Sequence, residues 1–258
     1  MILGIIGSPR RNGRTAQLMQ AALEGAAAKG AQTRSICLAD YAVRPFTGQG
    51  NAEEAETFCP ETLSLLCEEA DALIVGAPVY YGDINGLTKD FMDTVRIANA
   101  NGKPALGFAI AGGSGKGLLS GVQSIYHWFY HRQFRAIDPT PVSRFNMTEA
   151  MASLRQSGAR LVEEVGKAQP FPGRMRDDRW ADVLAHYATL PYFNADPVDE
   201  FLLLARQLIA CRQGQVPEEV LRLAQADYDR ALALLQGGQR AEAGRWAVRA
   251  YERLYYRG

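Results

Sequence analysis

The chain lacks the features that mark membrane, secreted and nucleic-acid-binding proteins. Its 258 residues include 28 Lys+Arg and 28 Asp+Glu, so no net charge draws it to nucleic acid or anionic lipid. No stretch approaches the roughly 18 uninterrupted apolar residues of a membrane-spanning helix. The N-terminus lacks the basic and long apolar regions of a signal peptide. These absences predict a cytoplasmic protein that binds a small molecule, with no membrane or nucleic-acid partner.

Cysteine is also scarce. Cys37, Cys59, Cys67 and Cys211 form no C-x-x-C pair and show no Cys/His spacing of a zinc site, so reduced thiols and no metal site are expected. His127 and His131, four residues apart, have a spacing that can bind metal on a helix. Because no carboxylate motif accompanies them, we interpret them as a packed or solvent-facing pair.

Residues 1 to about 166 alternate short apolar runs with longer amphipathic ones. Strands are predicted at Ile2–Ile6, Thr33–Cys37, Ala72–Val75, Ala105–Ile110 and Phe134–Val142, and helices at about 14–29, 60–70, 86–98, 117–132 and 149–166. This alternation predicts an α/β fold in which helices cover both faces of a five-stranded parallel sheet, giving three layers. Ligands of such sheets bind beyond the carboxyl ends of the strands, where the strand order reverses.

The pattern changes after residues 169–173, and no convincing strand follows. Asp196 and Pro197 read as the N-cap and first residue of a helix that runs to about 212. Pro217 opens another helix that ends near Gly237, and apolar residues recur at helical spacing from Ala243 to Leu254. We therefore predict a sheet domain over residues 1–168 and an all-α extension over 169–258.

The segment Gly7–Thr15, GSPRRNGRT, connects the first strand to the first helix. A glycine-containing loop at this position presents backbone N–H groups and the positive end of the helix dipole, which suits a phosphate. The spacing is neither that of a Walker A loop nor that of the dinucleotide fingerprint G-x-G-x-x-G. The alternative is an ordinary turn with solvated arginines, and for Arg11 alone that alternative is favoured.

Two further loops follow the third and fourth strands. Residues 77–86, APVYYGDING, offer two tyrosines to a flat ligand, although paired tyrosines also serve as packing residues. Residues 111–117, AGGSGKG, let backbone N–H groups approach a heterocycle and stabilise negative charge on it. A nucleoside-triphosphate site is disfavoured, because Gly117 stands where Ser or Thr would bind Mg²⁺.

A phosphate site, an aromatic segment and a glycine-rich edge in one pocket describe a site for flavin mononucleotide (FMN). The three motifs, with the segment KDFMD at residues 89–93, resemble the NADPH-dependent FMN reductase group of the flavodoxin-like superfamily. The resemblance covers roughly residues 1–166 and extends in particular to the iron–sulfur flavoproteins of that group.

The resemblance implies a role for each loop. The FMN phosphate would be held by Ser8, Arg10, Asn12, Gly13, Arg14 and Thr15. The isoalloxazine ring would be lined by Pro78, Val79, Tyr80, Tyr81, Gly82 and Asp83, and its pyrimidine side by Gly112, Gly113, Ser114 and Gly115. The implied activity passes electrons from NAD(P)H through FMN to a small-molecule acceptor such as a quinone or a flavin, with no catalytic residue required of the protein. The implied assembly is a homodimer or homotetramer.

One departure from the group is plain, and two other functions stay open. Iron–sulfur flavoproteins carry a compact cysteine motif after the second strand, whereas residues 44–50 contain no cysteine, so we predict no [4Fe–4S] cluster. A flavodoxin-type electron carrier is one alternative, although carriers that dock by electrostatics usually show one strong sign of charge. A protein-interaction module built on a flavin fold is the other.

The apolar stripes of the extension must be buried, in part among its own helices. The sharper hypothesis is that the extension also covers the flavin edge or a partner subunit. It assigns aromatic surface near the substrate to Trp180, Tyr187, Tyr192 and Phe193.

Overall fold

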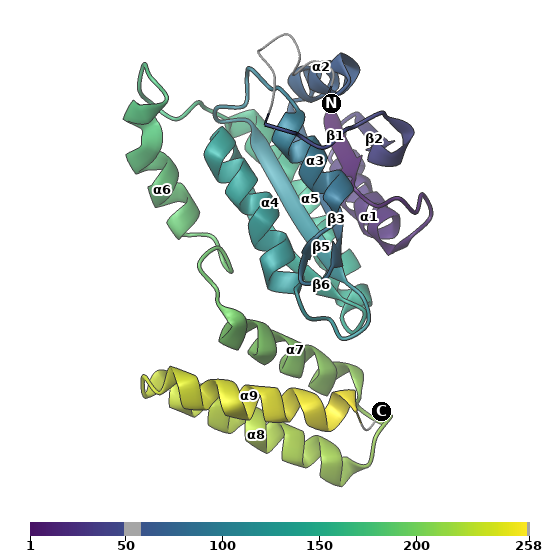
Figure 1. The fold of residues 1–258 in the computed structure, drawn as a ribbon, viewed down its shortest axis with the longest axis vertical. Helices are drawn as coiled ribbons and strands as arrows, with labels where there is room; N and C mark the ends of the chain where they lie inside the picture. Colours follow the sequence, from purple (N-terminus) through teal and green to yellow (C-terminus); the bar gives the residue numbers. More distant parts are fainter. Residues whose placement is uncertain (49–57, 257–258) are drawn as a thin grey trace.

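A computed structural model describes residues 1–48 and 58–256 and contains the predicted parallel sheet (Figure 1). Its strands are β1 (Ile2–Ile6), β2 (Thr33–Cys37), β3 (Ala72–Tyr80), β5 (Pro104–Ala111) and β6 (Arg135–Ser143), in the order β2-β1-β3-β5-β6. A short strand that we did not predict, β4 (Asp83–Ile84), pairs antiparallel with β3. Residues 49 and 50, at the end of the segment expected to lack an iron–sulfur motif, lie outside the described residues.

Helices cover both faces of the sheet. One layer contains α1 (Arg14–Ala28) and α5 (Met147–Lys167); the other contains α2 (Glu61–Glu69), α3 (Gly86–Thr94) and α4 (Leu118–Arg132), and the 3-10 turn η1 (Leu38–Asp40) follows β2. In β1, Ile2 and Ile6 belong to the core under α1 and α5, whereas Leu3 and Ile5 belong to the core under the other layer. A strand buried on both faces is apolar throughout, which is why β1 reads as a continuous hydrophobic run.

Strand β3 runs five residues beyond its predicted end at Val75, and Pro78 lies inside it. Proline lacks the N–H that a central strand needs. Here β1 ends at Ile6, opposite Gly76, so β1 does not extend alongside Pro78 and needs no N–H from it. The Pro78 carbonyl on that side instead accepts the Asn85 N–H at 3.1 Å.

Strand β6 forms an edge of the sheet and contains Pro139 and Pro141. Its register against β5 shifts between Leu106 and Phe108, where Asp138 has a φ of 46°. Prolines and bulges are both typical of edge strands, where they discourage pairing with another chain.

The extension is helical, as predicted. It consists of the 3-10 turn η3 (Asp177–Arg179), α6 (Trp180–Ala188), α7 (Pro197–Cys211), α8 (Glu218–Gln236) and α9 (Arg240–Tyr255). The predicted N-cap is confirmed, because the Asp196 side chain accepts from the N–H groups of Val198 and Asp199. The boundary at residues 168 and 169 stays a prediction. No helix among the described residues has both the length and the apolar character to cross a membrane.

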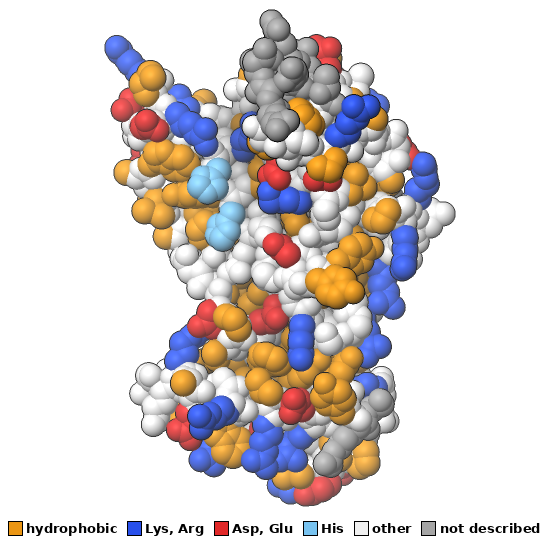
Figure 2. Space-filling view, viewed as in Figure 1, with side chains coloured by type: hydrophobic (Ala, Val, Ile, Leu, Met, Phe, Trp, Pro, Cys, Tyr) orange, Lys and Arg blue, Asp and Glu red, His pale blue; other side chains and the backbone are white. Residues whose placement is uncertain are grey.

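The C-terminal helices lie beyond the carboxyl ends of the strands, with α7 next to the sheet (Figure 1). Leu204 and Leu208 of α7 are fully buried in the same core as Leu118 and Leu119 of α4. Hydrophobic side chains gather where these helices approach the sheet (Figure 2). The extension therefore shares a hydrophobic core with the sheet domain.

Candidate functional site

A cavity of about 970 Å³ opens at the carboxyl ends of β1, β3 and β5. The chain passes from β1 to β2 on one side and then to β3 on the other, so the strand order reverses between β1 and β3. Parallel sheets bind ligands at such a point because the loops of the two strands diverge there.

The cavity brings together almost all of the predicted site residues. The predicted residues that line it are Ser8, Arg10, Asn12, Gly13, Arg14, Thr15, Pro78, Val79, Tyr80, Tyr81, Gly82, Gly112, Gly113 and Ser114. The predicted residues Asp83 and Gly115 do not line it.

Gln17, Ile110, Ala111 and Lys116 line the cavity without having been predicted. Gln17 lies four residues after Gly13, on the same side of α1, which is a signal that the sequence did contain. Ile110 and Ala111 end β5, whose carboxyl end was already expected at the site. Lys116 belongs to the glycine loop, from which only Gly112, Gly113, Ser114 and Gly115 were assigned to the flavin.

The loop between β1 and α1 is held by buried polar groups of the sheet domain. Gly7 N–H donates to the Gly76 carbonyl at 2.8 Å, and Asn85 Nδ2 donates to the Gly7 carbonyl at 2.9 Å. Thr88 Oγ1 in turn donates to Asn85 Oδ1 at 2.6 Å. A Cβ on Gly7 would lie 1.8 Å from Thr88 Oγ1, so only glycine fits here.

The same loop brings cations and hydrogen-bond donors to one end of the cavity. Among the described residues, no side chain caps the N-terminus of α1 at Gly13, and Gly13, Arg14 and Thr15 at this end of the helix line the cavity. The Ser8 and Thr15 side chains are buried beside it. Arg10 and Arg14 are exposed and, within residues 1–48 and 58–256, form no ion pair with a carboxylate. Arg11 differs from them, because it pairs with Asp40 and does not line the cavity.

The segment after β3 places aromatic rings at the mouth of the cavity. Tyr80 is 48% exposed and Tyr81 fully exposed, and Tyr81 has a φ of 53°, an uncommon value for a non-glycine residue. Asp83 instead anchors the turn: its Oδ1 accepts from the Ile84 N–H at 2.7 Å and from Ser124 Oγ at 2.6 Å. This explains why Asp83 does not line the cavity.

The glycine loop after β5 forms the third wall. Its backbone takes positive φ values at Gly113, Gly115 and Gly117. A Cβ on Gly115 would lie 2.7 Å from Leu204 Cδ2, so this glycine permits the close approach of α7. We expected Gly115 to face the cavity, but in the structure it lies against α7.

The charge of the cavity is of one sign. Arg10, Arg14 and Lys116 line it, and no Asp, Glu or His is among the described residues that do so. His127, which we interpreted as packed or solvent-facing, is exposed, and its ring contacts Phe193 edge-on, with ring centroids 5.0 Å apart. Burial is the largest cause of the lowered pKa of His127, followed by the neighbouring His131. The cavity thus offers cations and hydrogen-bond donors but no obvious general base.

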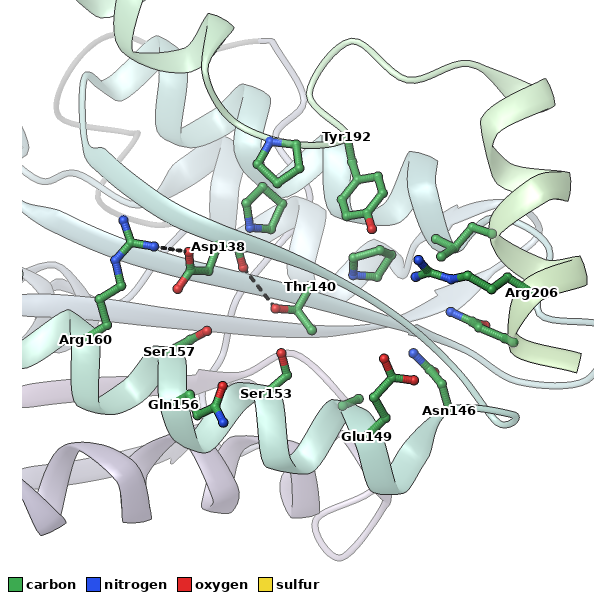
Figure 3. Close-up of a pocket in the computed structure, with 16 residues that line it drawn as sticks. Asp138, Thr140, Asn146, Glu149, Ser153, Gln156, Ser157, Arg160, Tyr192 and Arg206 are labelled. Atoms are coloured by element: carbon green, nitrogen blue, oxygen red, sulfur yellow. Dashed lines mark hydrogen bonds and ion pairs between the residues drawn. The ribbon is translucent and has the colours of Figure 1, made fainter. Parts of the chain in front are cut away.

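A second cavity of about 440 Å³ lies between β6, α5 and α7 (Figure 3). Its lining carries both signs of charge: Asp138 is paired with Arg160 at 2.6 Å, and Glu149 and Arg206 lie at the other end. It borders the edge strand instead of the point where the strand order reverses, and no glycine loop lines it. The larger cavity is therefore the stronger candidate for the functional site.

The aromatic residues assigned to the substrate by the sharper hypothesis lie elsewhere. Trp180, Tyr187 and Phe193 contact Tyr130 of α4, with ring centroids 5.0, 5.3 and 5.8 Å away, and the Tyr192 carbonyl accepts from Gln123 Nε2. None of the four lines the candidate site. Their role is to fasten α6 and the following segment to α4, so this part of the hypothesis is wrong.

Cys59 and Cys67 are buried in the core of the sheet domain. Burial raises the pKa of the Cys59 thiol to about 11 and that of Cys67 to about 12, which keeps both protonated at neutral pH. In the part of the chain that the structure describes, no three His, Cys, Asp or Glu residues are grouped so as to hold a metal ion.

Comparisons with known proteins agree with this site. A family model described as NADPH-dependent FMN reductase matches residues 1–147, which include all three loops. An iron–sulfur flavoprotein of Methanocaldococcus jannaschii is 31% identical over 157 residues, covering 57% of this chain and 81% of that protein.

Two solved structures share the fold. A flavone reductase superposes with a TM-score of 0.53 at 18% identity, covering 66% of this chain and 65% of that one. The apo form of an NADH:FMN oxidoreductase superposes with a TM-score of 0.50 at 22% identity, covering 69% and 92%. Both likenesses lie in the flavodoxin-like fold that the sequence predicted. With its family model matched over more than half of its length, the chain belongs to the NADPH-dependent FMN reductase family, and it is an FMN-binding oxidoreductase.

Proposed function

We propose that this chain takes electrons from NAD(P)H onto FMN bound in the larger cavity and passes them to a small-molecule acceptor such as a quinone or a flavin. The observation that carries the proposal is the division of one cavity into two chemically different ends. One end offers the N-terminus of α1, buried hydroxyls and exposed arginines; the other offers tyrosines and a glycine backbone.

The residues present fit FMN, and each group has a role. Ser8, Thr15, Arg10, Arg14 and the first N–H groups of α1 would hold the phosphate, and Asn12 and Gly13 would complete that end. The ring would lie between the backbone of Gly112, Gly113 and Ser114 and the residues at and just after the end of β3, namely Pro78, Val79, Tyr80, Tyr81 and Gly82. When bound, FMN supplies the acceptor of the hydride and the store of electrons.

The side chains and backbone of the cavity would bind and orient FMN and its reaction partners, without transferring protons. No carboxylate or imidazole among the described residues lines the cavity, so binding energy comes from cations, backbone donors and aromatic surface. A volume of about 970 Å³ lies at the upper end of the roughly 300–1,000 Å³ of small-molecule sites. That volume supports a site visited in turn by a donor and an acceptor. The positive lining favours partners with negative charge, such as a nicotinamide dinucleotide.

Anaerobic titration tests the proposal. We expect purified protein to carry one FMN per chain, and its flavin absorbance to bleach on addition of NADH or NADPH and to return with a quinone. A protein that does not bind FMN at micromolar concentration would overturn the proposal. Bound FMN that stays oxidised with both donors would instead favour the electron-carrier function.

We further propose that the protein works in the cytoplasm as an even-numbered homo-oligomer, a homodimer or homotetramer. Tyr81, fully exposed at the mouth of the cavity, supports a site completed by another molecule. Light scattering coupled to size exclusion measures the assembly directly, and a monomer at micromolar concentration would contradict it.

A further inference from the structure

The C-terminal helices make direct contacts with the glycine loop, although the family model ends at residue 147. Glu200, in the first turn of α7, accepts the Gly117 N–H with Oε1 at 3.0 Å and the Leu119 N–H with Oε2 at 3.1 Å. Gly117 is the N-cap of α4 and has no side chain to satisfy these donors. A carboxylate 83 residues away thus caps the helix that the glycine loop enters.

Two more contacts join the loop to the same helices. Tyr251 of α9 donates its hydroxyl to the Ser114 carbonyl at 2.9 Å, and its side chain is fully buried. Lys116 Nζ lies 5.5 Å from the centre of the Phe201 ring and 5.6 Å from that of Tyr251, within the range of cation–π attraction. Residues of α7 and α9 therefore hold the loop at Ser114, Lys116 and Gly117.

Few other hydrogen bonds among the described residues define the conformation of this loop. Within itself it makes the Gly115 N–H to Gly112 carbonyl bond at 2.8 Å and a longer contact from the Lys116 N–H to Ser114 Oγ at 3.4 Å. Glycine-rich backbone loses more conformational freedom on ordering than any other, so an unheld loop would have to be ordered by its ligand. Ordering the loop in advance improves affinity by removing that requirement.

We infer that the C-terminal helices are part of the flavin site, with Glu200 as the positioning residue that sets the glycine loop in its binding conformation. The inference rests on the proposed function. In this inference the extension affects flavin binding through the contacts of α7 and α9 with the glycine loop, and not through the aromatic residues of α6. Glu200 does not line the cavity, so it acts through the backbone of Gly117 and Leu119.

The test measures FMN binding and apo-protein stability in the full-length chain. The variants are Glu200→Ala, Glu200→Gln and Tyr251→Phe, and the control is Glu219→Gln, which removes an exposed carboxylate of α8 paired with Arg222. FMN dissociation constants come from quenching of flavin fluorescence, loop geometry from the visible circular dichroism of bound FMN, and stability from thermal unfolding without FMN.

We expect Glu200→Ala to raise the FMN Kd about tenfold or more, equivalent to about 1.4 kcal/mol, and to change the dichroism of bound FMN. Glu200→Gln should recover part of the affinity because its amide oxygen still accepts an N–H bond. Tyr251→Phe should raise the Kd about threefold, and Glu219→Gln should leave it unchanged. If Glu200→Ala does not fold, the other two variants decide the question.

Two outcomes would overturn the inference. If Glu200→Gln and Tyr251→Phe lower the melting temperature but keep the wild-type Kd and dichroism, the contacts are merely structural and the proposed function stands. If wild-type protein binds no FMN, both this inference and the proposed function fail.

Discussion

Two loops of this molecule meet at one cavity but are held by different parts of the chain. The loop between β1 and α1 is fixed from within the sheet domain, through Gly76, Asn85 and Thr88. The glycine loop after β5 is fixed from outside it, through Glu200 and Tyr251, which lie 83 and 137 residues from their partners. The proposed phosphate end is therefore built into the sheet domain, whereas the glycine loop of the proposed ring end is also held by the C-terminal extension.

The largest expected effect contrasts the glycines of the two loops. Gly7→Ala should lower the free energy of unfolding by about 3 kcal/mol or more, because its Cβ would overlap the fully buried Thr88. Gly112→Ala is the matched control, since no atom lies within 4 Å of the added Cβ. Urea unfolding of the apo-proteins measures both. Equal stability of the two variants would show that the first loop is less tightly fixed than the structure indicates.

The second contrast lies within the loop between β1 and α1. Arg10→Ala should weaken FMN binding by about 1.5–3 kcal/mol, the worth of a charge-assisted hydrogen bond. Arg11→Ala should change it little, because Arg11 pairs with Asp40 away from the cavity. Riboflavin, which lacks the phosphate, should bind both variants as it binds the wild type. An Arg10→Ala protein with unchanged FMN affinity would remove Arg10 from the phosphate site.

A smaller effect is expected from the ion pair at the N-terminus of α7, which does not contact the glycine loop. Arg240 hydrogen-bonds to Asp196, which lowers the pKa of that carboxyl. Such a group stabilises the fold above its unfolded pKa of about 3.9, and this contribution is lost as the pH falls through the lower folded pKa.

Because both side chains of this pair are more than a third exposed, Arg240→Ala should destabilise the protein by no more than about 1 kcal/mol at pH 7. The difference from wild type should shrink below about pH 4. FMN affinity should not change, since the pair does not touch the glycine loop. A loss of FMN affinity as large as that of Glu200→Ala would mean that any loosening of α7 disturbs the site.

The last prediction is that the protein contains no iron–sulfur cluster. Metal analysis of anaerobically prepared protein should find neither iron nor acid-labile sulfide. Cys59 and Cys67 are buried thiols, and the segment after the second strand contains no cysteine motif to complete a cluster. Stoichiometric iron would contradict this prediction and would indicate a cluster like that expected in iron–sulfur flavoproteins.

Sequence patterns predicted the parts of the site that depend on neighbouring residues. Periodicity placed β1 and β2 at their observed bounds, and the Asp196-Pro197 signal located the start of α7. The end of β3 was missed because Pro78 argues against a strand, and only the early end of β1 makes a proline acceptable there.

Long-range contacts were not predictable in the same way. Nothing local to Gly115 shows that it faces Leu204, and nothing local to Glu200 shows that it caps α4. The aromatic residues of α6 were assigned to the substrate because they are aromatic and unassigned, whereas tertiary contacts place them on α4. Local signals therefore identified the loops, and the tertiary structure was needed to show what holds them.

The central claim is that the three loops form one FMN site, and a crystal structure of the protein with bound FMN tests it most directly. We predict the phosphate at the N-terminus of α1, in contact with Ser8, Arg10 and Thr15, and the ring between residues 78–82 and the backbone of Gly112–Ser114. Glu200 should still accept the Gly117 N–H in that complex. FMN bound elsewhere, such as in the cavity beside β6, or with its phosphate away from α1, would contradict the account.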